Sequence, residues 1–580
     1  MFMLITLAFV ALLAAPVRNT TDLATSVAAK YAASSADEAE TKSREMKPLT
    51  SCGPLRRRST LYALQNDVTS AGTCFSIEED NITLDLNGHT VTYATTDGTK
   101  ATFGVLAADC WEKSVEGNPC GGSHRHPVVM NGKIVQGPGA ASMSHALRFG
   151  QASNLTGIIV HDLDITISAQ DSIGIYSEYL PGGSDIYRNT IHNNVKVISN
   201  RHQFRGTSIK LDEEGTAKLP DLIHDNTIIG GPHAGIRSDN PAGTRIYAND
   251  VSQDTTYTNG FCIDAAGKGI EVSGNKCHPT HGRGIHTHAS GVRIFDNVIE
   301  TIDSDKNAEY NGCEINGTYG IQIESDGPED PTDIRVYHNQ VKVHAAECTA
   351  EAMRLTELKK GASVEIYDNT FIAVQDKIGA NLSDKGARGF SVGDVSGDHV
   401  VFTHNIVQAD TAIFHTDWDS CRSMKLKENT FRAGVHGTGT LLAEFDNGAA
   451  PSQENVFENN VIQGFSSSSA KFGEYVGDSW FVVVSALKVH LDDQSGTALA
   501  GATVEAIGLS EPSGSVVSDA HGDAQLSIPL LRVENKQPLK KYAAQMITIN
   551  REGCLPERVV LPQPQPSEIR RTLTCNARGN

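Results

Sequence analysis

The stretch Gly206–Ser325 decides the fold, because one short phrase returns in it five times. The copies are GTSIKLD at Gly206–Asp212, AGIRSD at Ala234–Asp239, FCIDAA at Phe261–Ala266, GRGIHTH at Gly282–His288 and YGIQIE at Tyr319–Glu324. Each copy has the length of a strand and alternates aliphatic with polar residues, the pattern of a strand with one buried face. Such a recurrence indicates a repeat architecture rather than a series of separate domains.

A second phrase stands between these copies: an aliphatic residue, an asparagine three positions later, and another aliphatic residue two positions after that. Its asparagines are Asn131, Asn189, Asn226, Asn249, Asn275, Asn297, Asn339, Asn369, Asn405, Asn429 and Asn459. Asp162 occupies the matching place in a further copy. Two strand phrases that alternate every few tens of residues predict a solenoid.

The solenoid that fits both phrases is a parallel β-helix, because one coil of short strands cannot bury its own apolar face. Stacked coils bury one inward ladder, which we expect to consist of Ile209, Ile236, Ile263, Ile285 and Ile321. Asparagine suits a tight corner because it tolerates left-handed backbone, and its amide can bond to the next coil. Parallel crossovers are overwhelmingly right-handed, so we predict that hand.

Over about residues 81–460, the chain resembles the pectate-lyase-like superfamily of right-handed parallel β-helices. The phrase ITLDLNGHTV at Ile82–Val91 is similar to the first coil of such proteins. Nearer the C-terminus, Gly501–Val504 and Ser518–Ala524 resemble the carboxypeptidase-regulatory-like module, a transthyretin-like β-sandwich. The predicted fold class is therefore all-β: a right-handed parallel β-helix followed by a small β-sandwich. The superfamily includes lyases, hydrolases, epimerases and adhesins, so the fold leaves the activity open.

Changes in composition predict the domain boundaries. We expect 1–19 to be a signal peptide or N-terminal anchor, 20–50 a linker, 51–80 an N-terminal cap, 81–465 the β-helix, 466–480 a second linker and 481–580 the sandwich. Met1–Ala15 is apolar and ends in small residues, as secretory signals do, and it is too short to span a membrane comfortably. We therefore predict a secreted, periplasmic or cell-surface protein.

Charge and cysteine content agree with export. The net charge of -20 argues against a nucleic-acid or anionic-membrane partner. The 11 cysteines include no CxxC pair, so an oxidising compartment explains them better than a zinc ribbon. The expected pairs are Cys52–Cys74, Cys110–Cys120, Cys262–Cys277, Cys313–Cys348 and Cys554–Cys575, with Cys421 left over.

The chemistry is expected on the outward face of the first phrase, where stacked coils align side chains in two columns. The first column reads Arg148, Tyr176, Lys210, Arg237, Asp264, His286, Gln322, Arg354, Ser391 and His415. The second column includes Glu178, Asp212, Asp239, His288, Glu324 and Asp417. Charged and catalytic residue types gather here on successive coils, although ordinary stacked salt bridges would give a similar pattern.

The favoured activity is a polysaccharide lyase that cleaves uronate-containing glycans by β-elimination. Lys210 is the expected base, Arg237 neutralises the substrate carboxylate, and Glu178, Asp212 and Asp239 form an oxygen-rich cluster that could hold Ca²⁺. His286 completes the catalytic candidates, together with Asp239 and Asp264. The expected sugar-binding residues are Tyr176, Arg283, His288, Gln322, Glu324 and Arg354.

Other functions remain open at this stage. Asp239 and Asp264 lie on adjacent coils about 8 Å apart along a diagonal, a separation that suits an inverting glycoside hydrolase. A uronan epimerase would use the same scaffold. His286 and His288 alone are a weak metal signal. A rigid adhesin or glycan-binding surface protein without catalysis is the alternative from another class.

Overall fold

The computed structural model describes residues 46–108, 126–150, 157–178, 180–199, 205–213, 217–254, 260–280, 282–303, 318–325, 330–345, 349–358, 361–376, 386–416, 421–436, 439–446, 451–474, 476–507, 515–542, 546–561 and 568–575. The predicted signal peptide and nearly all of the first linker lie outside these residues. In the described part of the chain, no helix has the length and apolarity needed to cross a membrane.

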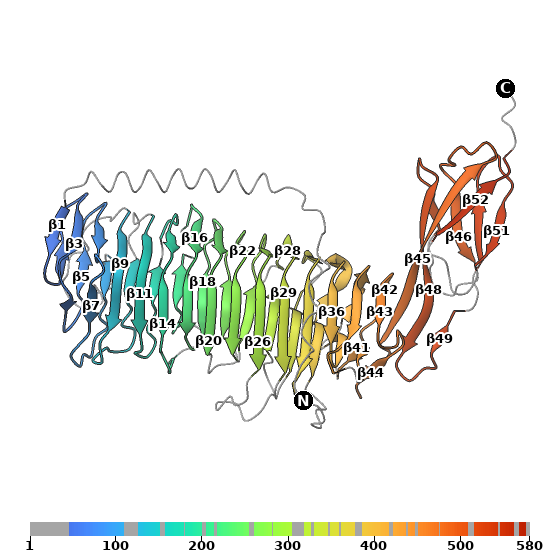
Figure 1. Ribbon diagram of the computed structural model, residues 1–580. Coiled ribbons are helices and arrows are strands. Elements are labelled where there is room, and N and C mark those ends of the chain that lie inside the picture. The colour runs from blue at the N-terminus through green and yellow to red at the C-terminus, as the bar shows by residue number, and fades with distance from the viewer. Residues whose placement is uncertain are drawn as a thin grey trace, which may run out of the picture.

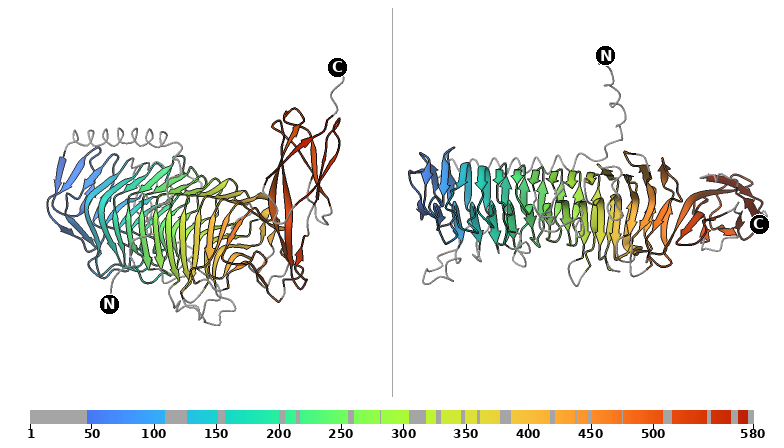
Figure 2. Two further views of the ribbon diagram at one scale, coloured as in Figure 1. Left: turned by 45° about the vertical axis from the view of Figure 1, so that its right-hand side comes forward. Right: turned by 90° about the horizontal axis from the view of Figure 1, so that it is seen from below.

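The described residues form a long parallel β-helix with three sheets along its axis, followed by a β-sandwich (Figures 1 and 2). Sheet 1 contains the first sequence phrase. Its strands are β2 (Gly53–Leu55), β5 (Phe75–Ile77), β8 (Val105–Ala108), β10 (Leu147–Gly150), β12 (Ile175–Glu178), β15 (Ile209–Asp212), β18 (Ala234–Ser238), β21 (Phe261–Ala265), β24 (Arg283–Thr287), β27 (Thr318–Glu324), β30 (Ala350–Thr356), β33 (Ala387–Gly393), β37 (Ala412–Thr416), β41 (Leu441–Phe445) and β44 (Ala470–Phe472).

Sheet 2 contains the strands that lead into the asparagine corner. They are β1 (Met46–Leu49), β3 (Leu61–Leu64), β6 (Thr83–Asp85), β9 (Val128–Gln136), β11 (Ile159–Ile167), β13 (Asp185–Tyr187), β16 (Asp221–His224), β19 (Thr244–Tyr247), β22 (Glu271–Ser273), β25 (Arg293–Phe295), β28 (Ile334–Tyr337), β31 (Val364–Tyr367), β35 (Val400–Thr403), β39 (Lys425–Lys427), β42 (Asn455–Glu458) and the start of β45 (Trp480–Asp493).

Sheet 3 follows the corner, and β9 and β11 run through the corner into it. Its other strands are β4 (Val68–Thr69), β7 (Thr90–Tyr93), β14 (Thr190–Asn193), β17 (Thr227–Gly230), β20 (Asp250–Asp254), β23 (Lys276–Thr280), β26 (Val298–Asp303), β29 (Gln340–Ala345), β32 (Thr370–Gln375), β36 (Ile406–Ala409), β40 (Thr430–Ala433) and β43 (Val461–Gln463). β34 (Val395–Ser396) pairs with β38 (Cys421–Arg422), and Gly397–His399 form a 3₁₀ turn.

The predicted inward ladder is confirmed. Ile209, Ile236, Ile263, Ile285 and Ile321 are opposite one another on successive strands of sheet 1, and all are fully buried. Toward the C-terminal coils the core changes from aliphatic side chains to phenylalanines. Their rings pack within a coil, as Phe390 and Phe402 do with centroids 4.4 Å apart, and between coils, as Phe390 and Phe414 do at 5.9 Å. One continuous apolar core therefore runs through the solenoid.

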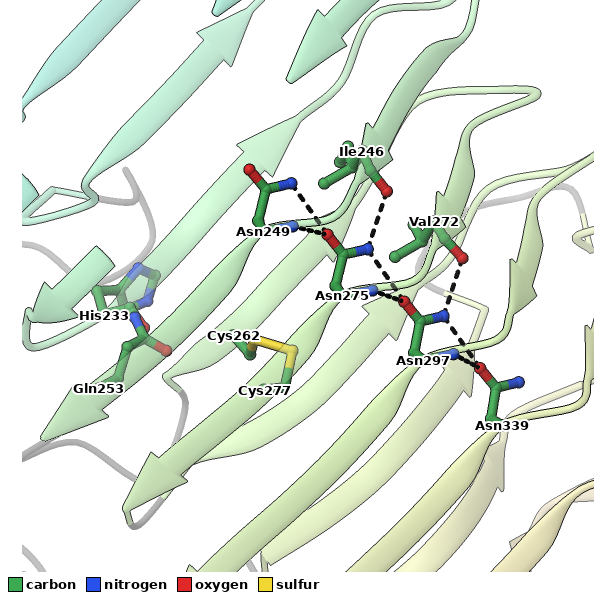
Figure 3. Close-up of a disulfide and its surroundings, with 10 residues drawn as sticks. All are labelled: His233, Ile246, Asn249, Gln253, Cys262, Val272, Asn275, Cys277, Asn297 and Asn339. Carbon is green, nitrogen blue, oxygen red and sulfur yellow. Dashed lines mark hydrogen bonds between the residues drawn. A yellow bond between two sulfur atoms is a disulfide. The ribbon is translucent and has the colours of Figure 1, made fainter. Parts of the chain in front are cut away.

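The asparagine ladder is real, but its members do not adopt left-handed backbone. Each buried asparagine donates its amide to the oxygen of the asparagine on the next coil, as Asn249 does to Asn275 at 2.9 Å and Asn275 to Asn297 at 3.0 Å (Figure 3). The positive φ belongs to the residue before the asparagine, such as Ala248 and Asp296. Side-chain bonding along the stack therefore explains the asparagine, while the preceding residue makes the bend.

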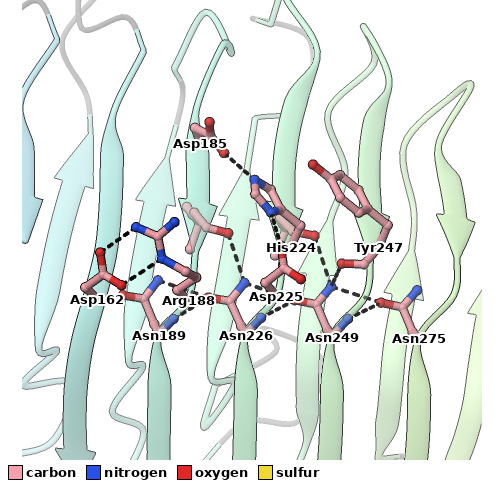
Figure 4. A network of polar contacts seen from close by, with 12 residues as sticks. Asp162, Asp185, Arg188, Asn189, His224, Asp225, Asn226, Tyr247, Asn249 and Asn275 are labelled. Atoms are coloured by element: carbon pink, nitrogen blue, oxygen red, sulfur yellow. Dashed lines mark hydrogen bonds and ion pairs between the residues drawn. The ribbon is translucent and has the colours of Figure 1, made fainter. Parts of the chain in front are cut away.

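This division of roles corrects three positions of the predicted column. Asn131, Asp162 and Asn459 have positive φ values of 59°, 54° and 52°, so they are bend residues. The ladder position beside Asp162 is Leu163, whose backbone N–H donates to Asn189 Oδ1, and at the other end it is Asn460, which accepts from Asn429. Asp162 instead forms an ion pair with Arg188 beside the ladder (Figure 4).

Three predicted disulfides are present: Cys52–Cys74, Cys262–Cys277 and Cys554–Cys575. Cys262–Cys277 joins sheets 1 and 3 within one coil (Figure 3). Cys421 is free and buried. The predicted pairs Cys110–Cys120 and Cys313–Cys348 lie outside the described residues.

Two predicted boundaries differ from the structure. Residues 51–80, expected to cap the solenoid, already form coils, because β2 and β5 pair in parallel with the following strands of sheet 1. Residues 466–480, expected to be a linker, contain β44, which pairs with β41. The serines that suggested this linker form a turn instead, in which Ser469 Oγ donates to Ser466 O at 2.7 Å.

The C-terminal module is a sandwich with its own core. One sheet consists of the distal part of β45 with β48 (Asp523–Glu534), β49 (Lys540–Lys541) and β52 (Glu568–Leu573). The other consists of β47 (Val516–Val517), β46 (Thr503–Ile507), β50 (Met546–Asn550) and β51 (Glu557–Val560). Residues such as Leu491, Val504 and Ile549 are buried between them.

Candidate active site on the outer face of sheet 1

The outward column of sheet 1 has the predicted register. Strand pairing places Arg148, Tyr176, Lys210, Arg237, Asp264, His286, Gln322, Arg354, Ser391 and His415 opposite one another in this order. Alternation along each strand turns these side chains away from the isoleucine core, and parallel pairing at about 4.8 Å brings them into contact. The predicted site residues on β12 to β30 therefore share one face.

Asp212 and Asp239 form a pair of hydrogen-bonded carboxyls on this face. Burial and the hydrogen bond and charge of Asp212 raise the pKa of Asp239 to about 7. Burial alone would raise the pKa of Asp212 as well, but the Lys210 ammonium and its hydrogen bonds lower it. The pKa of Asp239 thus lies above that of Asp212, so Asp239 is the member of the pair that keeps a proton to the higher pH. Their side chains are 31% and 10% exposed, so both lie at the surface of the site.

Lys210 does not lie as a base would. Its Nζ donates to Asp212 Oδ2 at 2.7 Å and lies 5.1 Å from the centre of the Tyr176 ring. Tyr176 also donates its hydroxyl to Asp212 Oδ2 at 3.4 Å. The predicted base Lys210 is therefore engaged in an ion pair with Asp212.

A chain of ionic contacts continues from Arg237 across three coils. Arg237 pairs with Asp264, which accepts from His286 Nδ1 at 2.8 Å, and His286 Nε2 lies 2.9 Å from Glu324 Oε1. Burial would lower the pKa of His286, but its bonds to the two carboxylates outweigh burial and raise it to about 9. The charge of Arg237 and the His286 hydrogen bond likewise outweigh burial and hold the pKa of Asp264 far below its usual range.

This chain encloses Asp264, one carboxylate of the predicted hydrolase pair. The Asp264 side chain is 0% exposed and is held between Arg237 and His286. A carboxylate that catalyses hydrolysis must reach a water or the glycosidic oxygen, and the buried Asp264 side chain is not exposed to solvent. Diagonal spacing alone predicted the pair, and burial could not be read from that spacing.

The remaining predicted binding residues form an aromatic and cationic patch beside Glu324. The Arg283 guanidinium lies between two rings, 5.2 Å from the centre of Phe261 and 5.1 Å from that of Tyr319. Arg354 lies over the other side of Tyr319 at 4.9 Å, and Gln322 donates to Glu324. The structure thus brings Arg283, Gln322, Glu324 and Arg354 together. The predicted binding residue Tyr176 lies instead beside Lys210.

The three predicted calcium ligands each have a partner of their own. Glu178 pairs with Arg148, Asp212 with Lys210, and Asp239 accepts the Glu213 backbone N–H at 2.5 Å. Among the described residues, the group of His, Asp and Glu side chains whose ligand atoms all lie within 4.8 Å of one another is Asp264, His286 and His288. The predicted calcium cluster is not such a group.

Two buried acids below Asp239 escaped the sequence analysis. Glu213 is fully buried, accepts from Ser177 Oγ at 3.0 Å, and has a pKa raised to about 10 by burial and by the charge of Asp221. Burial also raises the pKa of Asp221, which accepts the Ser184 N–H at 2.7 Å. The sequence signal that could have revealed Glu213 is its place directly after the outward-facing Asp212, where alternation turns a charged residue inward.

A second polar cluster lies further along sheet 1. Arg388 contacts Glu444 at 2.9 Å, Asp446 at 3.5 Å and Glu351 at 3.7 Å. His415 lies 3.3 Å from Asp446. Arg354 pairs with Glu351 at 2.8 Å and also contacts Tyr319, so it connects this cluster with the patch beside Glu324. The polar face therefore continues beyond the predicted site, with cations and carboxylates alternating.

Comparison with known proteins does not identify the function of this chain. No protein-family model and no curated protein sequence matches the chain. Among solved structures, the chain is similar to a variant of the tailspike protein of E. coli bacteriophage HK620, with 10% identity over 90% of this chain and 89% of that one and a TM-score of 0.39. Another variant, in complex with a pentasaccharide, matches with 9% identity over the same shares and the same TM-score.

Similarity at this level carries no conclusion about function. The parallel β-helix follows from the strand pairing itself. Membership of the pectate-lyase-like superfamily and of the carboxypeptidase-regulatory-like family stays a prediction.

Proposed function

We propose that this protein is a secreted polysaccharide lyase that cleaves uronate-containing glycans by β-elimination, with Asp212 and Asp239 as its acid/base pair. The feature that supports this most is the contact of two carboxyls whose pKa values are shifted in opposite directions, that of Asp239 raised to about 7 and that of Asp212 lowered. A protonated and an ionised carboxyl in contact can donate one proton and accept another. The disulfides suit an oxidising compartment outside the cell.

The reaction balances on this pair. Asp212 accepts the C5 proton of the uronate, the C4–O4 bond breaks as the C4–C5 double bond forms, and Asp239 gives its proton to the leaving O4. The pair still holds one proton afterwards, now on Asp212, and the hydrogen bond between the two returns it to Asp239. No water is consumed.

Lys210 and Arg237 stabilise the charge that develops when the C5 proton leaves. They are opposite each other on β15 and β18, beside the acid pair. A uronate carboxylate is bonded to C5, so two cations at this place offset its negative charge and make the C5 proton more acidic. Arg283, Gln322, Glu324, Arg354 and His288 supply hydrogen-bonding groups further along the same face for neighbouring sugars.

Elimination fits this geometry better than hydrolysis does. Glycosidases separate their two carboxyl groups by about 5–5.5 Å or 6.5–9.5 Å, because a sugar or a water lies between them. The groups that remove the C5 proton and protonate O4 act on atoms carried by adjacent carbons of one sugar, three bonds apart, so a carboxyl pair in hydrogen-bond contact is suitable. Calcium held by Glu178, Asp212 and Asp239 stays a prediction, and such an ion would take the places of Arg148 and Lys210.

A screen of uronate-containing and neutral polysaccharides tests the proposal. Elimination gives an unsaturated product with new ultraviolet absorbance. Asp239→Asn and Asp212→Asn should each lower kcat/KM at least about a hundredfold, the lower end for loss of acid/base catalysis. In the wild type, kcat/KM should fall above about pH 7, because Asp239 must carry its proton to act as the acid.

The matched control is Asp164→Asn on β11. Asp164 is also an aspartate in an ion pair, with Lys133 at 3.3 Å, but it lies on the outside of another sheet. Its activity should stay at the wild-type level. Reducing ends without ultraviolet absorbance would mean hydrolysis, a change of C5 configuration without cleavage would mean epimerisation, and glycan binding alone would mean an adhesin. Full activity in both site variants would remove the pair from the mechanism.

A further inference from the structure

Two histidines and two carboxylates gather around β24. His286 lies on this strand, His288 directly follows it, Asp264 comes from β21, and Glu324 from β27. Ligand atoms of Asp264, His286 and His288 all lie within 4.8 Å of one another. Glu324 Oε1 is 2.9 Å from His286 Nε2, so a second carboxylate borders the same space.

We propose that Asp264, His286 and His288 bind a divalent transition-metal ion of the Zn²⁺ class, with Glu324 as a further ligand. Imidazole and carboxylate ligands suit such ions, and two histidines with one carboxylate are a frequent ligand set. Metal–ligand bonds of about 2.0–2.2 Å require ligand atoms about 3–4 Å apart, so an ion bound here would replace the hydrogen bond between His286 and Asp264. This inference goes beyond the proposed lyase and does not depend on it.

The surroundings position the ligands. The ring of Phe261 stacks on His286 with centroids 4.7 Å apart, so it limits rotation of this imidazole. Arg237 holds Asp264 Oδ2, which leaves Oδ1 turned toward His286. Such partners outside the ligand set fix ligand orientation in metal sites.

Burial gives the site a closed and an open side. Asp264 and His286 are 0% and 4% exposed, and they form the floor. Glu324 is 22% exposed, so an ion bound here would meet solvent or substrate on that side. Arg237 adds a positive charge that opposes a metal ion, and the two carboxylates offset it.

Calorimetric titration of the full-length chain with Zn²⁺, followed by metal analysis after dialysis, tests the proposal. We expect one ion per chain at this site, and His288→Ala should weaken binding at least about tenfold. Glu324→Gln should weaken it in the same direction. The binding is measured without a substrate, so failure of the lyase proposal would leave this result unaffected.

His344→Ala is the matched control. His344 on β29 also lies between two carboxylates, 3.1 Å from Asp376 and 3.3 Å from Glu300, but among the described residues these three do not form a group whose ligand atoms all lie within 4.8 Å of one another. Its Zn²⁺ affinity should equal that of the wild type. Melting curves establish that each variant is folded. The proposal is overturned if the wild type binds no Zn²⁺, or if folded His288→Ala and Glu324→Gln bind it as the wild type does.

Discussion

Glu213 directly follows β15 and connects the buried core to the acid pair. Asp212 points outward into the acid pair, and the next residue turns inward and is fully buried. Its backbone N–H holds Asp239 at 2.5 Å, while its side chain meets Ser177 and the charge of Asp221. A carboxyl without solvent beside another acid keeps its proton, so Glu213 is neutral, whereas its backbone N–H lowers the pKa of Asp239 and opposes the effect of burial there.

The first prediction at this scale concerns stability against pH. The folded chain holds the Glu213 proton up to about pH 10, whereas the unfolded chain releases it near 4.5. The free energy of unfolding therefore falls between these values, by at most about 1.4 kcal/mol per pH unit for one group. Glutamine at position 213 does not titrate, so unfolding of Glu213→Gln releases no proton from this side chain. The melting temperature of this variant should therefore fall less than that of the wild type between pH 5 and pH 9.

Melting curves at several pH values measure this difference. Glu365→Gln on β31 is the control, because the Glu365 side chain is 47% exposed and replacement should leave the slope unchanged. Equal slopes for the wild type and Glu213→Gln would show that Glu213 is ionised in the folded protein.

At the residue scale, the sequence predicted which side chains share a face but not which of them are reachable. Period-2 alternation and stacking placed Lys210, Arg237, Asp264 and His286 in register, because both follow from backbone geometry. Whether Asp264 meets water depends on its neighbours on other coils, and no pattern within one strand encodes this. The same holds for the proton on Asp239, which depends on its contact with Asp212.

At the scale of elements, the corner between sheets 2 and 3 joins the coils through side chains. Asn297 is fully buried, donates to Asn339 Oδ1 at 3.0 Å and to Val272 O at 2.9 Å, and accepts from Asn275. Outside the corner, rings of sheet 2 stack in register, as His224 and Tyr247 do at 4.6 Å (Figure 4). The asparagine contact repeats from coil to coil, whereas the stack of rings is interrupted at Ser273.

Asn297→Ala should therefore lower stability by about 3 kcal/mol, because it leaves several buried backbone and amide groups without partners. The expected readout is a clear fall in the melting temperature. Asn131→Gly is the control: Asn131 is an exposed bend residue with φ 59°, which glycine adopts without strain. A melting temperature that falls equally in both variants would contradict the role of the ladder.

The sequence predicted this ladder almost completely, and the reason for its errors is physical. The repeat of asparagine is visible because each member needs the same neighbour above and below. The bend before it accepts Arg188, Asp225, Ala248 or His338, so its sequence pattern is weak. Asn131 and Asn459 were assigned to the ladder because asparagine also suits the bend position.

At the scale of the whole molecule, one strand belongs to both domains. β45 begins as the last strand of sheet 2, where Asn455–Glu458 pair in parallel with Phe481 and the residues after it. Phe481 is buried in the core of the β-helix, and Leu487, Val489 and Leu491 of the same strand are buried in the core of the sandwich. Ser527 Oγ also donates to Glu458 Oε1 across the junction at 2.6 Å. The sandwich therefore covers the C-terminal end of the solenoid (Figure 2).

A chain that ends after Asp478 should thus be less stable than the full chain, although every sheet 1 strand is retained. Its last coil would expose the edge of β42 and the core side chains beside Phe457, and an uncovered apolar end of a solenoid favours association. We expect a lower melting temperature and more light scattering on heating. The comparison is the full chain with Cys554→Ser and Cys575→Ser, which loosens the far part of the sandwich and keeps β45 on β42, so the β-helix should melt as in the wild type. If the truncated chain melts at the wild-type temperature and stays monomeric, the sandwich does not stabilise the end of the solenoid, because the strand that both domains share can then be removed without cost.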